Sequence, residues 1–339
     1  MPSKIIPRND PEANVLVYKE MERPLKQILK SFADRNTKGM MQTVTNILKD
    51  AGYDGTNRAS VMIKKADPKT IKSLELLAQK LPESDRQRFN TKLYGQIGSG
   101  SLTVRKAINN AIKYGSTAYS KDLYMAGKDV LRDTAKEGML RGEFMVQKGV
   151  GVGWQMETPG LKVVDTFLKD RWTENDASEY LRPMSQAVRE QVEAGLFLGE
   201  HPSKIAERMQ RVEEINDVRA NRNARTITTA VANEAHMEQY KKDGVERYRF
   251  VATFDERTCP VCGDLDGREF KITDRSSSNY PPIHPNCRCT TVAVLGKKAQ
   301  ANVNRILEAH KNDKTVKITP GTTFNEWVGK QVIQPKQKG

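Results

Sequence analysis

The chain has 339 residues, with 56 Lys and Arg against 42 Asp and Glu, and it contains four His and four Cys. This length allows two or more domains with a substantial core. We find no run of about eighteen apolar residues and no apolar stretch near the start. We therefore expect neither a membrane span nor a secretory signal, and a protein made in the cytoplasm. The formal net charge of +14 fits a polyanionic partner such as nucleic acid, and it equally fits many solvated lysines, because charge specifies function weakly.

The first part of the chain predicts helices. Apolar residues recur every three or four positions in two stretches, one of them interrupted by Pro24. The second stretch is expected to stop at Gly52, where glycine can adopt the left-handed conformation of a helix cap. A long helix is predicted from 101 to about 147, with a break near Gly115. We interpret residues 1–150 as a helical N-terminal region.

A glycine-rich segment with the sequence KGVGVG follows at 148–153. Its glycines are typical of a phosphate-binding loop, but no clear strand precedes it and no Gly-Lys-Ser/Thr follows. A hinge or domain boundary is the favoured interpretation, and the TPG sequence at 158–160 supports it.

The second half begins with three predicted helices, which make up a region from 160 to 244. The first helix is expected to be capped at Gly195. The second is expected to start with Ser203 as its N-cap, and the third to cover about 222 to 243. On the third helix His236 lies opposite the apolar face, so we expect its side chain to be solvated.

The apolar period then changes from that of a helix to that of a strand. Tyr248 and Phe250 alternate with Arg247 and Arg249, and a period of two predicts a strand with one buried face. Further strands are predicted at 268–272 and 290–295, which defines a small β unit at 245–296. The sequence therefore predicts a mainly α fold with a small β unit near the C-terminus, an α+β arrangement that we expect zinc to stabilise.

The last segment, 297–339, is a basic tail with nine Lys and Arg against three acidic residues. It starts with a short predicted helix and ends in an apolar patch around Trp327. We favour Trp327 as a docking anchor over a base-stacking residue, because no second aromatic lies next to it. The tail is the best candidate for contact with double-stranded DNA. Its lysines are spaced irregularly, so we expect it to bind backbone phosphates without sequence preference.

All four cysteines lie between 259 and 289. A secreted disulfide-built domain would spread its cysteines along the chain, so this clustering favours a metal site. Two short turns, CPVC at 259–262 and HPNC at 284–287, each place two donors three residues apart around a proline. Two such turns can close a tetrahedron of ligands around zinc. A disulfide pair and plain buried thiols are the alternatives.

Five donors compete for the four positions of such a site. If the chain is extended after the second turn, the last two cysteines face the same side, whereas a turn there would aim them apart. A site with four protein ligands is closed, so the zinc would be structural and not catalytic. We favour Cys259, Cys262, His284 and Cys287 as ligands, with Cys289 as a substitute for any of them.

Four carboxylates crowd the first of these turns: Asp255, Glu256, Asp264 and Asp266. A metal-dependent nuclease would use such groups, and this is the alternative function. We favour an acidic turn before a strand, because no free histidine is placed nearby as a base. We find no Ser/His/Asp or Cys/His catalytic triad. We therefore expect no catalytic residues and no enzyme.

The cysteine region resembles a known family, the bacteriophage minor head or head morphogenesis proteins, also called phage Mu F-like. The family pattern is Asp-x-Arg-Thr-Cys-x-x-Cys, then Leu-Asp-Gly, then Pro-Pro-x-His-Pro-Asn-Cys-Arg-Cys. Here these motifs stand at 255–262, 265–267 and 281–289, and the preceding helix fits with Arg225-Thr226 and Asn233-Glu234. The resemblance covers roughly 165–295, whereas the first 150 residues resemble no family that we can name.

The resemblance implies a low-copy virion component inside the capsid. Such a protein joins the procapsid beside the portal, with the portal protein and the inner capsid or scaffold as partners and no membrane. It is also a candidate for ejection with the DNA. A pure assembly adaptor, whose positive charge offsets an acidic portal surface, is a further interpretation.

Overall fold

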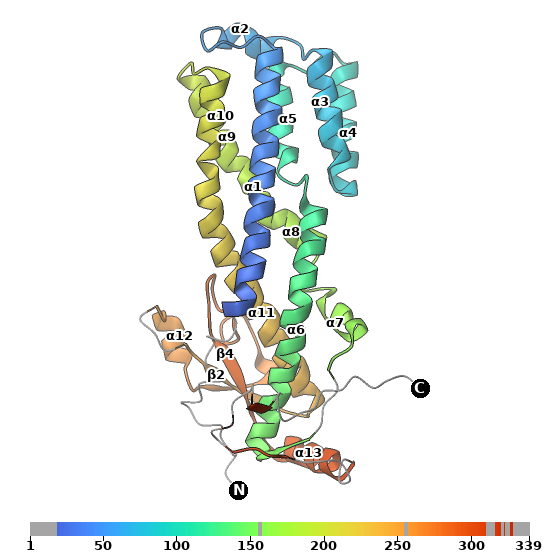
Figure 1. The fold of residues 1–339 in the computed structure, drawn as a ribbon, viewed down its shortest axis with the longest axis vertical. Helices are drawn as coiled ribbons and strands as arrows, with labels where there is room; N and C mark the ends of the chain where they lie inside the picture. Colours follow the sequence, from blue (N-terminus) through green and yellow to red (C-terminus); the bar gives the residue numbers. More distant parts are fainter. Residues whose placement is uncertain are drawn as a thin grey trace. The chain divides into compact units, whose positions relative to one another are not determined.

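The computed structural model describes residues 19–154, 158–253, 257–309, 316–319, 322 and 326–327. The chain is mainly helical with a small antiparallel sheet, as the sequence predicts (Figure 1). Among the described helices, none is long and apolar enough to cross a membrane. The helices are α1 Lys19–Asp50, α2 Arg58–Ile63, α3 Pro68–Gln79, α4 Glu83–Gly98, α5 Val104–Gly115, α6 Ser120–Val150, α7 Leu161–Leu168, α8 Glu174–Leu181, α9 Met184–Phe197, α10 Pro202–Gln210, α11 Val212–Lys242, α12 Pro260–Leu265 and α13 Lys297–Ala309, with a 3-10 helix at Ile272–Asp274.

The described strands form two sheets. In the three-stranded sheet the order is β3-β2-β4, and both pairings are antiparallel, with Tyr248 opposite Phe270 and Ala293. A second, two-stranded sheet pairs β1 with β5 in antiparallel fashion. The strands are β1 Val152–Gly153, β2 Arg247–Val251, β3 Glu269–Lys271, β4 Thr290–Val294 and β5 Val316–Lys317.

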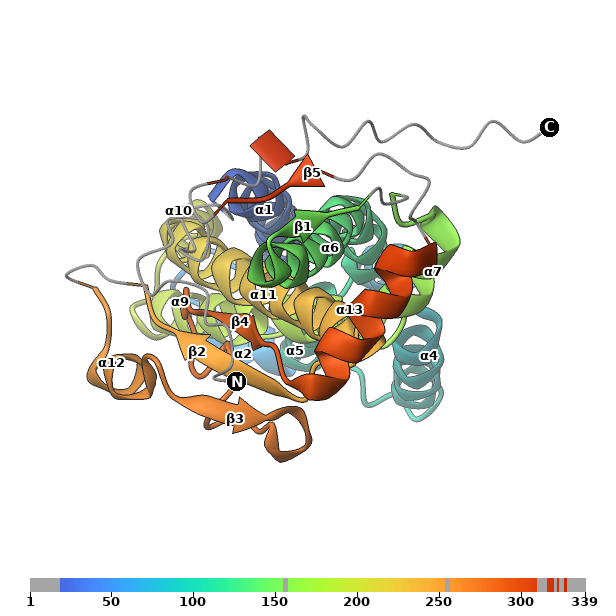
Figure 2. The same cartoon turned by 90° about the horizontal axis from the view of Figure 1, so that it is seen from below.

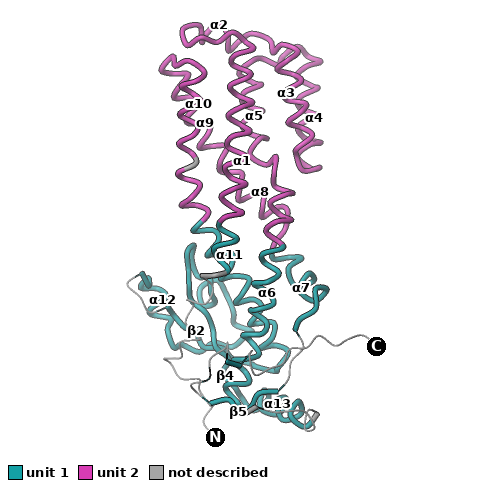
Figure 3. The backbone as a smooth tube through the Cα atoms, viewed as in Figure 1, with its two compact units in different colours: residues 1–26, 129–171, 221–339 teal, residues 27–128, 172–220 magenta. Residues whose placement is uncertain are grey.

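The chain divides into two compact units (Figure 3). Unit 1 comprises residues 1–26, 129–171 and 221–339, and unit 2 comprises 27–128 and 172–220. The long helices α1, α6 and α11 contribute residues to both units. The four regions expected from the sequence, 1–150, 160–244, 245–296 and 297–339, are continuous stretches of chain. This division stays a prediction.

The described part of unit 2 consists of helices around an apolar core. Helix α5 contacts α2, α3, α4 and α9, and α9 in turn contacts α10. Trp172 is buried, and its indole Nε1 donates a hydrogen bond to the carbonyl of Tyr124 at 2.8 Å. The indole lies against Gly127, where an added Cβ would come within 2.7 Å of Cζ2 of the tryptophan. Close approach of the indole to α6 therefore requires glycine at 127.

The predicted helix ends are partly correct. Gly52 has a positive φ of 73° directly after α1, and α5 ends at Gly115, as expected. The expected cap at Gly195 is wrong, because α9 continues to Phe197 and the residue with a positive φ is Gly199, at 67°. Gly195 instead packs closely: an added Cβ would lie 2.6 Å from Cγ1 of Ile205.

The two following helix starts also differ from the expectation. The N-cap of α10 is His201 and not Ser203, because Nδ1 of His201 accepts a hydrogen bond from the Ser203 amide at 3.3 Å. Helix α11 begins at Val212, well before the expected position 222. Its early part runs through charged residues, which hide the apolar period from sequence analysis.

In unit 1 the three-stranded sheet packs on α11 (Figure 2). Burial alternates along β2 as predicted, with Tyr248 and Phe250 fully buried. The hydroxyl of Tyr240 on α11 donates to the carbonyl of Thr291 in β4 at 3.1 Å. This arrangement fixes the sheet against α11, the helix that also contacts the turn at 284–287.

The far side of α11 in unit 1 is covered by α6. An added Cβ on Gly138 would lie 2.7 Å from Cβ of Ala235, and one on Gly142 would lie 3.0 Å from Cα of His236. The side chain of His236 is only 2% exposed, so the expectation that it is solvated is wrong. Burial, and then the charge of Arg141, lowers its pKa to about 3. The apolar period indicated one buried face, whereas α11 is buried on opposite faces.

Two carboxyl groups, Glu143 of α6 and Asp243 just after α11, are buried in unit 1. Gln147 donates to Glu143 at 3.2 Å, and Gln239 donates both to Glu143 and, at 3.1 Å, to Asp243. Burial, and then the charge of Asp243, raises the pKa of Glu143 to about 8. Burial also raises the pKa of Asp243. The pair therefore holds a proton at neutral pH in the folded protein.

This shared proton makes stability depend on pH. A carboxyl whose pKa rises from 4.5 to about 8 on folding contributes stability that is fully present below 4.5 and lost as the pH rises through 8. Glu143→Gln, which mimics the protonated acid, should raise the Tm relative to the unchanged protein at pH 9 by at least about 2 °C and have little effect at pH 5. His236, whose pKa shift has the opposite sign, is present in both proteins and cancels in the comparison. An equal decrease in Tm at both pH values would contradict this assignment.

Candidate metal centre

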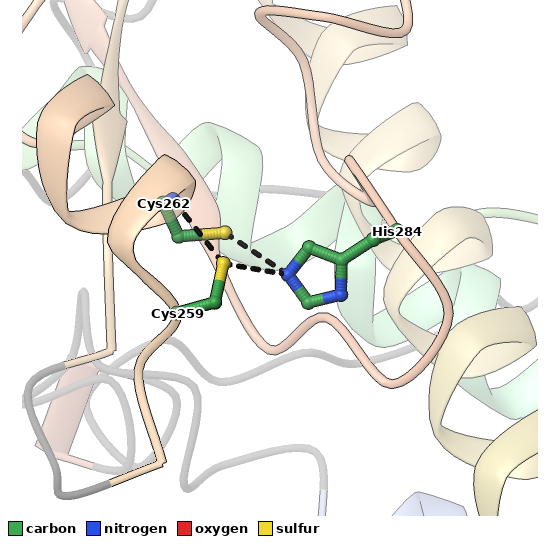
Figure 4. Close-up of side chains that lie close together, drawn as sticks. All are labelled: Cys259, Cys262 and His284. Carbon is green, nitrogen blue, oxygen red and sulfur yellow. Dashed lines mark hydrogen bonds between the residues drawn. The ribbon is translucent and has the colours of Figure 1, made fainter.

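Cysteine and histidine donors meet next to the sheet of unit 1 (Figure 4). Sγ of Cys259 lies 3.1 Å from Nε2 of His284, and Sγ of Cys262 lies 3.3 Å from the same nitrogen. Sγ of Cys262 also lies 4.0 Å from Sγ of Cys287. The ligand atoms of tetrahedral zinc stand roughly 3.5–3.8 Å apart, given the usual Zn–S and Zn–N bond lengths. The observed separations are therefore close to those of ligands that share one ion.

The donor atoms form two overlapping groups, and within each group they lie within 4.8 Å of one another. Cys262 belongs to both groups, so all five predicted donors come together around it. Which four of them bind stays a prediction. The four cysteines are free thiols, as a metal site requires. The groups are Cys259, Cys262 and His284, and Cys262, Cys287 and Cys289.

The first turn owes its shape to a helix start. Cys259 is the N-cap of α12, and its Sγ accepts a hydrogen bond from the amide of Cys262 at 3.4 Å. Pro260 occupies the first helical position, where its missing N–H costs nothing and its φ suits a helix. The capping geometry turns both sulfur atoms to the same side, toward His284 (Figure 4).

The second turn, HPNC at 284–287, requires one residue in the left-handed backbone conformation. Asn286 has a φ of 72°, a conformation that asparagine tolerates better than most residues. The amide of Cys287 donates to the carbonyl of His284 at 3.1 Å and closes the turn. Nδ1 of His284 donates to the carbonyl of Pro285 at 2.8 Å, which leaves Nε2 with its lone pair toward the sulfur atoms.

One face of α11 holds this second turn in place. The four residues that contribute lie at positions 225, 226, 229 and 233, a spacing that places them along one side of a helix. Asn233, fully buried, also accepts a hydrogen bond from Thr290 at 3.0 Å. The contacts with the turn are Arg225 Nη1 to Asn286 Oδ1 (2.7 Å), the Asn286 amide to Thr226 Oγ1 (2.8 Å), Thr229 Oγ1 to the Cys287 carbonyl (3.1 Å) and Asn233 Nδ2 to the Cys289 carbonyl (3.2 Å).

Residues 186–292 match the family model described as phage Mu protein F like protein. Over these residues, the chain is similar to the phage Mu protein F like family. The match contains all five donors and the polar face of α11, and it confirms the resemblance seen in the motifs. It indicates a phage head-related protein. Comparison with curated proteins and with solved structures found no significant match.

The shifted pKa values of the cysteines in this Mu F-like region are consistent with a cation bound among the donors. A hydrogen bond from the thiol of Cys289 is the main cause that lowers the pKa of Cys287, to about 5. Burial, and then the charge of Cys287, raises the pKa of Cys262 to about 12. Without a cation, repulsion between thiolates limits how many can ionise. Thiolates and a neutral imidazole are the ligands that zinc prefers, so the residues fit the metal expected from the sequence.

The two described carboxylates near the donors, Asp264 and Asp266, do not join them. Oδ1 of Asp266 accepts a hydrogen bond from the amide of Ala252 at 3.0 Å and so ties the turn after α12 to the end of β2. Asp264 is exposed, and Asp255 and Glu256 lie outside the described residues. In the part of the chain that the structure describes, neither donor group includes a carboxylate. An acidic turn describes this segment better than a second metal site.

Thr229 and Tyr280 of the Mu F-like region were not among the site residues expected from the sequence. The hydroxyl of Tyr280 donates to the carbonyl of Asn233, and the ring lies edge-on to Tyr248 with centroids 5.4 Å apart. Thr229 shares a helical spacing of three and four with Thr226 and Asn233. This run of small polar residues on a buried helix was the signal that could have found it.

Proposed function

We propose that this protein is a minor head protein that acts in phage head morphogenesis. It joins the inside of the capsid next to the portal, contacts packaged double-stranded DNA and leaves with the DNA on ejection. Its partners are the portal protein and the inner capsid or scaffold, and it enters the virion after synthesis in the host cytoplasm. The match over residues 186–292 carries this proposal.

We further propose a structural Zn²⁺ at the cysteine and histidine donors. Bound there, the ion would link the turn at the start of α12 to the loop before β4, two segments separated by more than twenty residues. Four protein ligands leave no open position for a reacting water, so the ion would stabilise the β unit and perform no chemistry. The observation in support is the convergence of five donors held by α12 and α11.

The described parts of the basic tail pack on the rest of unit 1. Ala299 and Val303 of α13 are buried, and Trp327 is 1% exposed. Trp327 is therefore an anchor docked on the protein, as favoured from the sequence. Deleting 297–339 would remove part of the core, so a test of DNA contact should remove only the exposed positive charges of α13. These are Lys297, Lys298 and Arg305.

Neutralising these three charges with glutamine should weaken DNA binding in a salt-dependent way. Removing one phosphate contact reduces the slope of log K against log salt by about 0.9, because fewer counterions are released. Fluorescence anisotropy with duplexes of two unrelated sequences measures this slope, and both duplexes should bind alike. The matched control is the triple variant Lys49→Gln, Lys64→Gln and Lys69→Gln, which removes three exposed charges elsewhere. If the α13 variant binds DNA as tightly as the unchanged protein, with the same salt slope, the tail is not the DNA contact. If the unchanged protein binds no DNA at all, the pure assembly adaptor is favoured.

We also propose that the protein does not hydrolyse DNA. Linear duplex DNA incubated with the protein and Mg²⁺ or Mn²⁺ should stay intact, because a closed ligand set offers no activated water. Gel electrophoresis over several hours measures this. Reproducible cleavage that Asp264→Asn or Asp266→Asn abolishes would establish the rival function, a metal-dependent nuclease that processes DNA ends.

A further inference from the structure

Unit 2 carries a cluster of basic side chains on three neighbouring helices, which we name the lysine cluster. It consists of Lys92 on α4, Lys106 and Lys113 on α5, and Arg189 on α9, and the three lysines are exposed. Nζ of Lys92 and Nζ of Lys113 stand 6.0 and 5.4 Å from the ring centroid of Tyr114. Nη1 of Arg189 donates to Oδ1 of Asn109 on α5 at 3.0 Å.

The charges of the lysine cluster are not balanced by carboxylates. Within the described residues, none of its four members forms an ion pair, whereas Arg132 and Arg208 elsewhere each pair with a carboxylate at 2.5 Å. Burial, and then the positive charges of Lys113, Arg189 and Lys106, lowers the pKa of Lys92. The cluster thus keeps like charges close together, and a bound anion would relieve their repulsion.

The composition of the surface indicates which anion it suits. The central part of a protein interface is depleted in lysine and enriched in aromatic side chains. The aromatic rings at the cluster, Phe89 and Tyr114, are buried, and the exposed Tyr94 of α4 is hydrogen bonded to Glu75 of α3. A surface of lysines without an apolar centre is instead typical of binding to phosphodiester backbones.

The spacing of the lysines also suits a polyanion. Lys106 and Lys113 are separated by two turns of α5, about 10 Å along the helix axis. This separation equals about three nucleotide steps of B-form DNA, so the two lysines can contact different phosphates. Lys92 supplies a third charge from α4, so the positive surface is broader than one helix.

We propose that the lysine cluster is a phosphate-binding surface for a nucleic acid backbone, separate from the basic tail. The inference rests on the proposed function only for the identity of the polyanion, packaged DNA. It gives a role to part of the N-terminal region, which lies outside the family match. We expect binding there to be independent of base sequence, because contacts to phosphates carry no direct sequence information.

The test is a salt series of DNA binding with the full chain. The triple variant Lys92→Gln, Lys106→Gln and Lys113→Gln should lower the slope of log K against log salt by about two to three, and the affinity at low salt at least about tenfold. The control variant at Lys49, Lys64 and Lys69 removes the same net charge from unit 2 and should behave like the unchanged protein. Replacing the three cluster lysines with arginine should retain binding. Far-UV circular dichroism verifies that all variants fold.

A footprint on the unchanged protein provides a second readout. DNA should protect Lys92, Lys106 and Lys113 from acetylation more strongly than Lys49, Lys64 and Lys69, as measured by mass spectrometry. A cluster variant that binds like the control, or equal acetylation of both sets, would overturn the inference and leave an acidic protein surface as the occupant. If the α13 variant alone flattens the slope, the inference fails and the tail contact of the proposed function stands. If the cluster variant alone flattens it, the tail contact fails and the inference stands.

Discussion

Replacing Cys262 with serine should abolish metal binding and loosen the whole β unit. Cys262 is the donor that both groups share, so its loss removes the sulfur that connects Cys259 and His284 to Cys287 and Cys289. Structural zinc contributes about 10–16 kcal/mol of binding free energy in zinc-finger peptides, and here the ion would join the turn at the start of α12 to the loop before β4. Loss of the site should therefore expose residues 245–296 to proteolysis, while the helices keep most of the far-UV signal, because their apolar faces do not depend on the metal.

Cys289→Ser is the matched control for this prediction. The favoured ligand set leaves Cys289 out, so this variant should retain the ion. Elemental analysis of freshly purified, reduced protein should give one zinc per chain for the unchanged protein and for Cys289→Ser, and none for Cys262→Ser. Unchanged protein without zinc, or Cys262→Ser with a full complement, would contradict the metal assignment.

Replacing Trp327 with alanine should destabilise unit 1 by about 3–5 kcal/mol, the usual cost of removing a buried aromatic side chain. The indole Nε1 donates to Oε1 of Gln147 at 2.8 Å, and the ring lies 5.5 Å from the ring of Phe144. Ile318 completes this small cluster of buried residues. Gln147 also donates to Glu143 and to the carbonyl of Trp154, so removal of the indole leaves a buried amide oxygen without this donor.

Trp327→Phe separates packing from hydrogen bonding in this prediction. Phenylalanine keeps most of the buried ring but cannot donate to Gln147, so the destabilisation should be smaller, about 1–3 kcal/mol. Urea unfolding followed by circular dichroism measures both variants. A change below about 0.5 kcal/mol for Trp327→Ala would mean that the C-terminal segment is not anchored on unit 1.

Local patterns in the sequence predicted the parts of the structure that depend on local physics. The alternation at Tyr248 and Phe250 predicted β2, because one face of that strand is buried and the other is not. The two proline-containing turns predicted the convergence of Cys259, Cys262 and His284, because each turn fixes its donors within four residues.

Features that depend on distant segments were not predictable in this way. His236 is buried because α6 covers a face of α11 that carries polar residues. The cap after α9 lies at Gly199 and not at Gly195 because packing against Ile205 requires the first glycine inside the helix. The lysine cluster likewise unites residues nearly a hundred positions apart, which charge counted along the chain does not reveal.

The central claim is that the protein is a structural component of the phage head. Quantitative mass spectrometry of purified particles, before and after triggered release of the DNA, tests it most directly. The account predicts that the protein is present in mature particles at far fewer copies than the major capsid protein, and that it is depleted after release. A protein that is abundant in infected cells but absent from procapsids and mature particles would contradict the account.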